Sequence, residues 1–380
     1  MAPWVPVSRP GVRRNLSLAM PMHDLIDRLI RSDIRALAAY HVPDHAGMIK
    51  LDAMENPYGW PETLKSEWLE VLRAVALNRY PEPQGPAVQA ALREAMEIPS
   101  EMAVLLGNGS DELIQMLALA VAGPGRKVLS LEPGFVMYRM IARFAGMEYV
   151  GVPLRPEDFS VDLPAVLEAI EREQPALVFL AYPNNPTGNR FDADDVVCMI
   201  EAAPGLVIVD EAYAPFTDCS FLALLGDWPN LLVLRTLSKM GLAGLRLGYL
   251  VGPQVWLDEI DKVRLPYNIN ALTQASAAFA LRHKSLLDAQ AQAIRAERHN
   301  LLAALSSLDG VHPYPSEANF ILFRAPKGRT DAIFSGLQGE GILIKNLNGS
   351  HPMLEDCLRV TVGRAEENAV FLSALTGLVS

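Results

Sequence analysis

The chain has 380 residues, of which half are apolar and 20% are charged, and its formal net charge is −11. This composition suffices for a large core and excludes a disordered chain or a coiled coil. The negative charge disfavours a general role in nucleic-acid binding, although a few local Arg and Lys residues can still bind an anionic ligand. No apolar run approaches the ~20 residues that a membrane-spanning helix needs, so we expect no membrane association.

The N-terminus and the cysteines indicate a cytoplasmic protein. Residues 1–21 contain three arginines but no continuous apolar segment, so a signal peptide is not expected. We interpret residues 1–21 as a disordered tail, or as sequence upstream of a start at Met22. Cys198, Cys219 and Cys357 are widely spaced, which favours reduced thiols over a disulfide framework or a zinc site. The seven histidines show no metal-binding spacing, and no metal is expected.

From residue 103 onward, short apolar runs alternate with helical patterns. The sequence predicts strands at 103–106, 127–131, 147–152, 176–181, 206–209, 231–235 and 247–251. Helices are predicted at 111–122, at 135–145 and from an N-cap at Asp162 to about residue 173. Strands that alternate with helices favour an α/β fold, with a mainly parallel sheet that helices cover on both faces.

The pattern changes after Pro266. Residues 273–307 are rich in Ala, Leu, Arg and Glu, which predicts long helices, and strands are predicted at 319–323, 341–344 and 358–362 with a helix after the first. These elements indicate a smaller α+β domain, with which residues 22–51 are expected to pack. We therefore predict an N-terminal arm (22–60), a large ligand-binding domain (61–270), linking helices (271–308) and a small C-terminal domain (309–380).

A lysine, Lys239, closely follows the predicted strand at 231–235. Ligand sites in open α/β sheets lie beyond the carboxyl ends of strands, and a lysine in such a cleft can lose its proton and act as a nucleophile. Taken alone, this lysine is more simply an exposed surface residue. Its neighbours favour the cleft, because Ser238 and Arg246 are good phosphate partners and the stretch GLAGLRLGY lets backbone approach a ligand closely.

Three further motifs follow predicted strands. Asp210 opens DEAY, at a place where an acid can keep the nitrogen of a heteroaromatic ring protonated. PNNPTG contains Asn185, although turn chemistry alone explains this motif. GNGSDE, with Ser110 and Asp111, joins a strand to a helix, and its backbone N–H groups suit an anion. Each of these signals is weak alone, so their combination and order carry the interpretation.

In combination, the motifs resemble a known family. The run TLSKMGLAGLRLGY, preceded by YPNNPTG and DEAY, is similar to that of the fold-type I pyridoxal-phosphate aminotransferases. Within that family, ENPYG at 55–59, RYPEPQG at 79–85, GNGSDELI and CLRVTVG at 357–363 are similar to segments of the histidinol-phosphate aminotransferases. The resemblance runs from about residue 33 to the C-terminus. It is highly specific for the cofactor and less specific for the substrate.

The resemblance implies a role for each matching residue around the cofactor. Lys239 would hold pyridoxal 5'-phosphate as a Schiff base and carry a proton during amino transfer, and Asp210 would keep the ring nitrogen protonated. Asn185 and Tyr213 would hydrogen-bond the ring's phenolic oxygen. The phosphate and the face of the ring would be bound by Ser110, Asp111, Phe135, Ser238 and Arg246. For Phe135, ordinary helix packing is an equally good explanation.

The resemblance also implies a homodimer with shared active sites and a substrate pocket. Tyr58 would reach the cofactor phosphate of the neighbouring subunit, although alone it is simply a tyrosine in a turn. In amino-acid-specific relatives, the arginine that matches Arg359 clamps the α-carboxylate of the substrate. Here Arg359 would instead contribute to binding the substrate's phosphate. The candidates for the substrate pocket are Tyr40, Tyr80, Asn185, Lys345 and Arg359.

The activity implied is that of a transaminase in histidine biosynthesis. It would exchange an amino group between L-histidinol phosphate and 2-oxoglutarate, giving imidazole-acetol phosphate and glutamate by a ping-pong mechanism. Three alternatives stay open: an aromatic amino-acid aminotransferase, a decarboxylase of an O-phospho-amino acid, and a non-catalytic relative of the fold. The presence of both Lys239 and Asp210 argues against the last alternative, because a domain without catalysis need not keep them.

Overall fold

The computed structural model describes residues 22–39 and 46–379, and the chain divides into two units between residues 43 and 44. In the first unit, α1 (Met22–Leu29) and α2 (Ser32–Arg35) contain no buried residues. An ion pair of 2.5 Å between Asp27 and Arg35 joins the two helices. The expected tail at 1–21 and the candidate residue Tyr40 lie outside the described residues.

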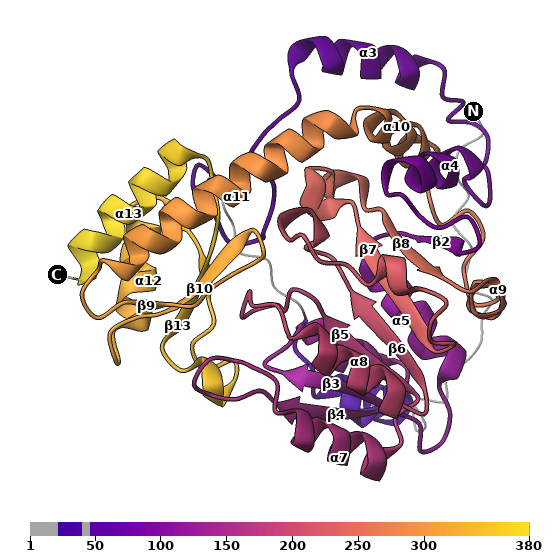
Figure 1. The fold of residues 1–380 in the computed structure, drawn as a ribbon, viewed down its shortest axis with the longest axis horizontal. Coiled ribbons are helices and arrows are strands. Elements are labelled where there is room, and N and C mark those ends of the chain that lie inside the picture. The colour runs from indigo at the N-terminus through magenta and orange to yellow at the C-terminus, as the bar shows by residue number, and fades with distance from the viewer. Residues whose placement is uncertain (1–21, 40–45, 380) are drawn as a thin grey trace, which may run out of the picture. The chain divides into compact units, whose positions relative to one another are not determined.

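The second unit is built on a seven-stranded sheet in the order β2-β8-β7-β6-β5-β3-β4 (Figure 1). β8 pairs antiparallel with both of its neighbours, and the other pairs are parallel. The predicted α/β fold with a mainly parallel sheet is therefore confirmed. The strands are β2 (Ala103–Gly107), β3 (Lys127–Glu132), β4 (Glu148–Pro153), β5 (Leu177–Ala181), β6 (Leu206–Asp210), β7 (Leu231–Thr236) and β8 (Gly248–Gly252).

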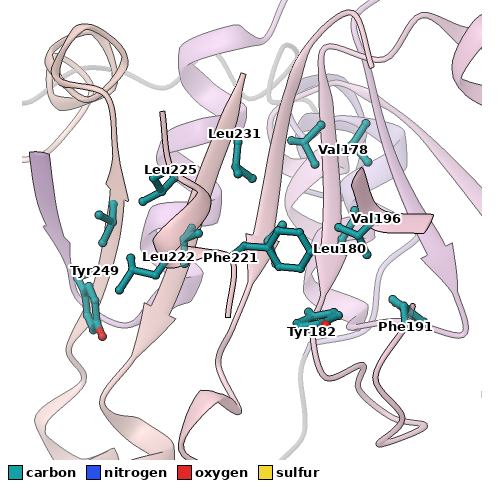
Figure 2. Packing of buried hydrophobic residues seen from close by; sticks show 14 of the residues in the cluster. Val178, Leu180, Tyr182, Phe191, Val196, Phe221, Leu222, Leu225, Leu231 and Tyr249 are labelled. Carbon is teal, nitrogen blue, oxygen red and sulfur yellow. The ribbon is translucent and has the colours of Figure 1, made fainter. Parts of the chain in front are cut away.

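Helices cover both faces of this sheet, because its central strands are apolar on both sides. In β5, Val178 belongs to one buried cluster and Leu177 to the other. Figure 2 shows part of the first cluster, where Val178 and Leu180 in β5 are followed by Tyr182 just beyond the end of that strand. The first face is covered by α4 (Pro86–Ala95), α7 (Leu163–Glu173), α8 (Ala193–Ala202) and α10 (Ala271–Arg282), and the second by α5 (Ser110–Val121), α6 (Val136–Phe144) and α9 (Gln254–Asp261).

Side-chain caps fix where several of these helices begin. The Oδ1 atom of Asp162 accepts a hydrogen bond from the N–H of Ala165 at 3.4 Å, which confirms the predicted N-cap of α7. The predicted helical region at 273–307 consists of α10 and α11 (Lys284–Ser306), which meet at His283. α3 (Glu62–Arg73) lies against α10, where the indole nitrogen of Trp68 donates to the hydroxyl of Ser276 at 2.8 Å.

A second, antiparallel sheet lies at the far end of α11 (Figure 1). Its order is β12-β13-β10-β9, and a separate parallel pair joins β1 to β11. The predicted strand at 341–344 corresponds to β11 alone, and β12 follows just beyond it, where the chain changes its pairing partner from β1 to β13. These elements are β1 (Ile49–Lys50), β9 (His312–Pro313), β10 (Phe320–Arg324), α12 (Thr330–Gly339), β11 (Ile342–Leu343), β12 (Lys345–Asn346), β13 (Cys357–Thr361) and α13 (Ala365–Val379). The predicted domain boundaries after residues 60, 270 and 308 stay predictions.

Candidate active site

Lys239 lies in a short helical turn at the carboxyl end of β7. This turn, η3 (Ser238–Met240), places the partly buried Lys239 side chain at a cavity of about 110 Å³. The Nζ atom donates to the carbonyl oxygen of Ala53 at 3.3 Å. Burial, reinforced by the positive charge of Arg359, lowers the pKa of Lys239 to about 8. Lys239 therefore meets the requirement for a nucleophilic amine at neutral pH.

Asp210 ends β6 and lines the same cavity, with only 4% of its surface exposed. Its Oδ1 atom accepts a hydrogen bond from the backbone N–H of Ala212 at 3.1 Å, and its Oδ2 atom accepts one from the hydroxyl of Tyr138 at 2.7 Å. Burial raises the pKa of Asp210 to about 6, and the two hydrogen bonds oppose that rise. The carboxyl group is therefore mostly ionised at neutral pH and can pair with a protonated ring nitrogen.

Asn185 connects the large sheet to the small one. Its Nδ2 atom donates to the hydroxyl of Tyr213 at 3.1 Å, and its Oδ1 atom accepts from Nη1 of Arg359 at 2.5 Å. Asn185 follows β5 and Tyr213 follows β6, whereas Arg359 comes from β13. Burial raises the pKa of Tyr213, so its hydroxyl stays protonated. The small sheet thus brings a guanidinium within hydrogen-bonding distance of a residue in the cavity wall.

The junction between β2 and α5 forms an anion-binding arrangement. α5 begins at Ser110, and the first N–H groups of a helix have no partner within it. Arg246 reaches this end of the helix, with Nη2 3.6 Å from Oδ2 of Asp111 and Nη1 3.5 Å from Oγ of Ser238. The close approach of the Arg246 guanidinium to the backbone requires glycine at position 109. There φ is +84°, and a Cβ atom would lie 2.7 Å from Nη2 of Arg246. Helix N-terminus, guanidinium and hydroxyl therefore converge as a phosphate requires.

Most of the predicted site residues line this one cavity. They are Ser110, Asp111, Phe135, Asn185, Asp210, Tyr213, Ser238, Lys239 and Arg246. Their chemistry fits pyridoxal phosphate, which needs an amine for its aldehyde, an acid for its ring nitrogen, donors for its phenolic oxygen and a cationic cradle for its phosphate. Residues from the carboxyl ends of β5, β6 and β7 supply the first three groups, as expected for a ligand site in an α/β sheet.

Four predicted residues in the described part of the chain do not line this cavity: Tyr58, Tyr80, Lys345, and Arg359, which contacts the lining residue Asn185. Tyr58 packs, partly buried, against the buried cluster of the small sheet. Tyr80 is 80% exposed and stacks on Tyr267, with 4.5 Å between the ring centroids. Lys345 pairs with Arg359 across β12 and β13, so the two side chains leave the small sheet on the same face. The roles of Tyr58, Tyr80 and Lys345 stay predictions.

Of the cavity residues that were not predicted from the sequence, Met54 and Tyr138 have the largest side chains. Met54 has a left-handed backbone with φ of +53°, which is uncommon for a residue other than glycine. Its N–H donates to Oγ1 of Thr361 at 3.0 Å and its carbonyl oxygen accepts from Asn319 at 2.9 Å, and these contacts hold the conformation. Tyr138 follows Phe135 by about one helical turn, a spacing that could have revealed it.

Metal-binding clusters and membrane-spanning helices are absent from residues 22–39 and 46–379. No group of three or more His, Cys, Asp or Glu side chains there is arranged to hold a metal ion. In the same ranges, no helix combines the length and the apolar character needed to cross a membrane. All three cysteines are free thiols.

Comparison with known proteins places the chain in a family. Residues 46–375 match the family described as "Aminotransferase class I and II". The chain is 57% identical to histidinol-phosphate aminotransferase 2 of Nitrosococcus oceani over 93% of this chain and 98% of that protein. It is 55% identical to the histidinol-phosphate aminotransferase of Chromobacterium violaceum over 92% of this chain and 98% of that protein.

A solved structure shows the same fold. The histidinol-phosphate aminotransferase of Sinorhizobium meliloti, described in complex with pyridoxal-5'-phosphate, superposes with a TM-score of 0.82 at 26% identity, over 92% of this chain and 97% of that one. The predicted fold-type I architecture and the predicted family are therefore both confirmed. The chain belongs to the class I and II aminotransferase family, among the histidinol-phosphate aminotransferases.

Proposed function

We propose that this chain is a pyridoxal-phosphate-dependent transaminase that exchanges an amino group between L-histidinol phosphate and 2-oxoglutarate. The observation that carries the proposal is one cavity lined by a buried acid, an amine of lowered pKa and a cradle for an anion. When bound, pyridoxal phosphate supplies an electron sink next to the carbon that gives up or receives the amino group. The names of the relatives support the choice of substrate.

Lys239 would hold the cofactor and move a proton at the α-carbon of the substrate. With a pKa of about 8, about a quarter of the Lys239 side chains are uncharged at pH 7.5, against roughly 0.1% for an ordinary lysine. Only the uncharged amine can attack a carbonyl carbon or accept a proton. Burial of Lys239 thus prepares both of its tasks before any ligand arrives.

The remaining residues would orient the ligands. Asp210 would hold the ring nitrogen protonated, and Asn185 and Tyr213 would donate hydrogen bonds to the phenolic oxygen. Ser238, Arg246 and the first N–H groups of α5 would bind the cofactor's phosphate. Arg359 and Lys345 project from one face of the small sheet, and two cations on one face suit the phosphate of the substrate.

A substrate panel tests the proposed reaction. We expect glutamate and imidazole-acetol phosphate to be converted with a kcat/KM at least about 100-fold above that for glutamate and phenylpyruvate, because the Arg359 and Lys345 cations have a phosphate to bind only in the first pair. Coupled detection of 2-oxoglutarate measures both reactions. A preference for phenylpyruvate would instead support an aromatic amino-acid aminotransferase, and carbon dioxide release from an O-phospho-amino acid would support a decarboxylase.

We also propose a homodimer in which Tyr58 serves the active site of the partner. Among the described residues, Tyr58 does not line the cavity of its own chain. Met54, which does line the cavity, directly precedes the ENPYG segment that contains Tyr58. Tyr80 and Tyr267 form an exposed aromatic pair, and Leu77 and Leu265 nearby in the sequence are also exposed, which offers apolar surface to a second copy.

Mixing two defective subunits tests this shared site. Lys239→Ala and Tyr58→Ala homodimers should each be impaired, the second through weaker cofactor binding. After joint refolding, half of the dimers are mixed and each mixed dimer has one intact site, so about a quarter of the wild-type activity should return. If Tyr58 served its own subunit, mixing would restore no activity. Size-exclusion chromatography with light scattering checks that dimers form at all.

A further inference from the structure

A fully buried tyrosine supports the acid of the proposed active site. Tyr138 comes from α6 and is 1% exposed, and its hydroxyl donates to Oδ2 of Asp210 at 2.7 Å. We propose that Tyr138 is a positioning residue: its hydroxyl holds the Asp210 carboxylate ionised and fixed, ready to pair with the ring nitrogen of the cofactor. This inference rests on the function proposed above and names a residue that the family resemblance did not supply.

The packing of Tyr138 leaves its hydroxyl in one place. The ring stacks on Phe179, with centroids 4.8 Å apart and planes within 9°, and meets Phe135 edge-on at 5.4 Å. Phe179 in β5 and Tyr138 belong to the same buried cluster, on the face of the sheet that α6 covers. Aromatic contacts on two sides fix the ring. Because the ring is fixed, the hydroxyl is directed at Asp210 before any ligand binds.

The second oxygen of Asp210 is held as well. Oδ1 accepts from the backbone N–H of Ala212, so each carboxylate oxygen has one donor. The backbone contact fixes the position of the carboxylate, and no substitution can remove this N–H without also altering the backbone. The Tyr138 hydroxyl is therefore the part of the arrangement that a side-chain change can test.

The charges around Asp210 make this donor necessary. Burial raises the pKa of Asp210, and the negative charges of Asp111 and Glu211 add to the rise. The Tyr138 hydroxyl is the strongest of the groups that lower it, ahead of the Ala212 N–H. Without the hydroxyl, the pKa of Asp210 moves toward neutral pH, and a larger share of the protein carries an uncharged acid that cannot hold a cationic ring nitrogen.

Tyr138 does not act as an acid or a base itself. Burial, followed by the adjacent Asp210 carboxylate, raises its pKa well above the ordinary value of a tyrosine. The phenol therefore stays protonated throughout the working pH range and can only donate. Its contribution passes through Asp210, which distinguishes it from Tyr213, whose hydroxyl bonds with Asn185.

Tyr138→Phe removes this one hydroxyl and keeps the ring. We expect the apoprotein to bind pyridoxal phosphate about 10- to 100-fold more weakly, as loss of a hydrogen bond to a charged group predicts, with kcat lowered and the substrate KM little changed. Absorbance titration measures the affinity, and a pH series of the visible band of the bound cofactor should shift. Tyr249→Phe is the matched control, because Tyr249 is equally buried but belongs to the cluster on the other face of the sheet.

A double variant separates positioning from a general structural effect. In an Asp210→Asn background there is no carboxylate to hold, so adding Tyr138→Phe should change cofactor affinity less than about twofold. Without any cofactor, the thermal midpoint of the Tyr138→Phe apoprotein should fall more steeply between pH 4 and pH 8 than that of the wild type. The reason is that a higher Asp210 pKa widens the pH range in which the folded chain keeps a proton that the unfolded chain has lost.

The outcomes distinguish failure of this inference from failure of the proposed function. If Tyr138→Phe keeps wild-type affinity and pH dependence, or loses as much affinity in the Asp210→Asn background as in the wild type, Tyr138 does not position the acid. If the wild-type protein itself forms no visible band with pyridoxal phosphate, the proposed function fails instead. The apoprotein midpoints still report on the Tyr138–Asp210 contact in that case.

Discussion

Lys239→Ala should lower kcat for amino transfer by about 10⁴-fold or more, because we propose that one amine both holds the cofactor and moves the proton. The variant should still bind pyridoxal phosphate through the anion cradle, but without a covalent bond. Borohydride reduction followed by mass spectrometry of peptides locates the attachment, and steady-state kinetics give the rate. Lys262→Ala is the matched control, since Lys262 is exposed and pairs with Glu259.

The geometry explains why no neighbour replaces this amine. The other cations near the cavity are Arg246 and Arg359, and guanidinium groups stay protonated at any working pH. Lys345 comes from the small sheet and lies outside the cavity lining. A variant that kept a tenth of the wild-type rate, or a labelled peptide that lacked residue 239, would contradict the assignment of Lys239.

Asp210→Asn should lower kcat by about 10²–10³-fold, because the charge that we propose to face the cofactor ring is lost while the shape of the site stays. The KM for glutamate should change little, since no described contact of Asp210 involves the residues assigned to the substrate. Steady-state kinetics at saturating cofactor measure both constants. A rate within threefold of the wild type would contradict the assigned role of Asp210.

The same substitution should stabilise the apoprotein. Burial raises the pKa of Asp210 from 3.8 to about 6. The folded chain therefore binds more protons than the unfolded chain between these pH values, and its stability falls as the pH rises through them. Above pH 6 the loss is roughly 3 kcal/mol. Asp210→Asn removes this loss, so its thermal midpoint should exceed that of the wild type at pH 8 and converge with it near pH 4. Asp227→Asn is the control, because it makes the same chemical change at an exposed position.

Local patterns were enough to predict much of this molecule. Short apolar runs predicted the seven strands of the large sheet, and the signal is strongest for strands buried on both faces, such as β5. The motifs around Lys239, Asp210 and Asn185 each directly follow such a strand, so they predicted one shared cavity edge. The resemblance of the motifs to a family supplied the cofactor, which no pattern of spacing could have named.

Contacts between distant segments could not be predicted in the same way. The hydrogen bond between Arg359 and Asn185 spans 174 positions in the sequence. The pairing of Tyr138 with Asp210 depends on which face of β6 the acid occupies and on the rotation of α6 above it. The left-handed backbone of Met54 is set by Thr361 and Asn319, far along the chain, and no turn signal marks it. Such features follow from tertiary packing rather than from local propensity.

The reversed direction of β8 has a consequence for how the site is assembled. β7 reaches the ligand edge at Thr236, and β8 leaves the same edge at Gly248, its pairing partner. A parallel neighbour would need a crossover to the opposite edge before returning. The short excursion between the two strands therefore carries both Lys239 and Arg246, so a single hairpin would deliver the proposed covalent anchor and the proposed phosphate clamp. The spacing between the two proposed contacts with the cofactor is therefore set within one loop.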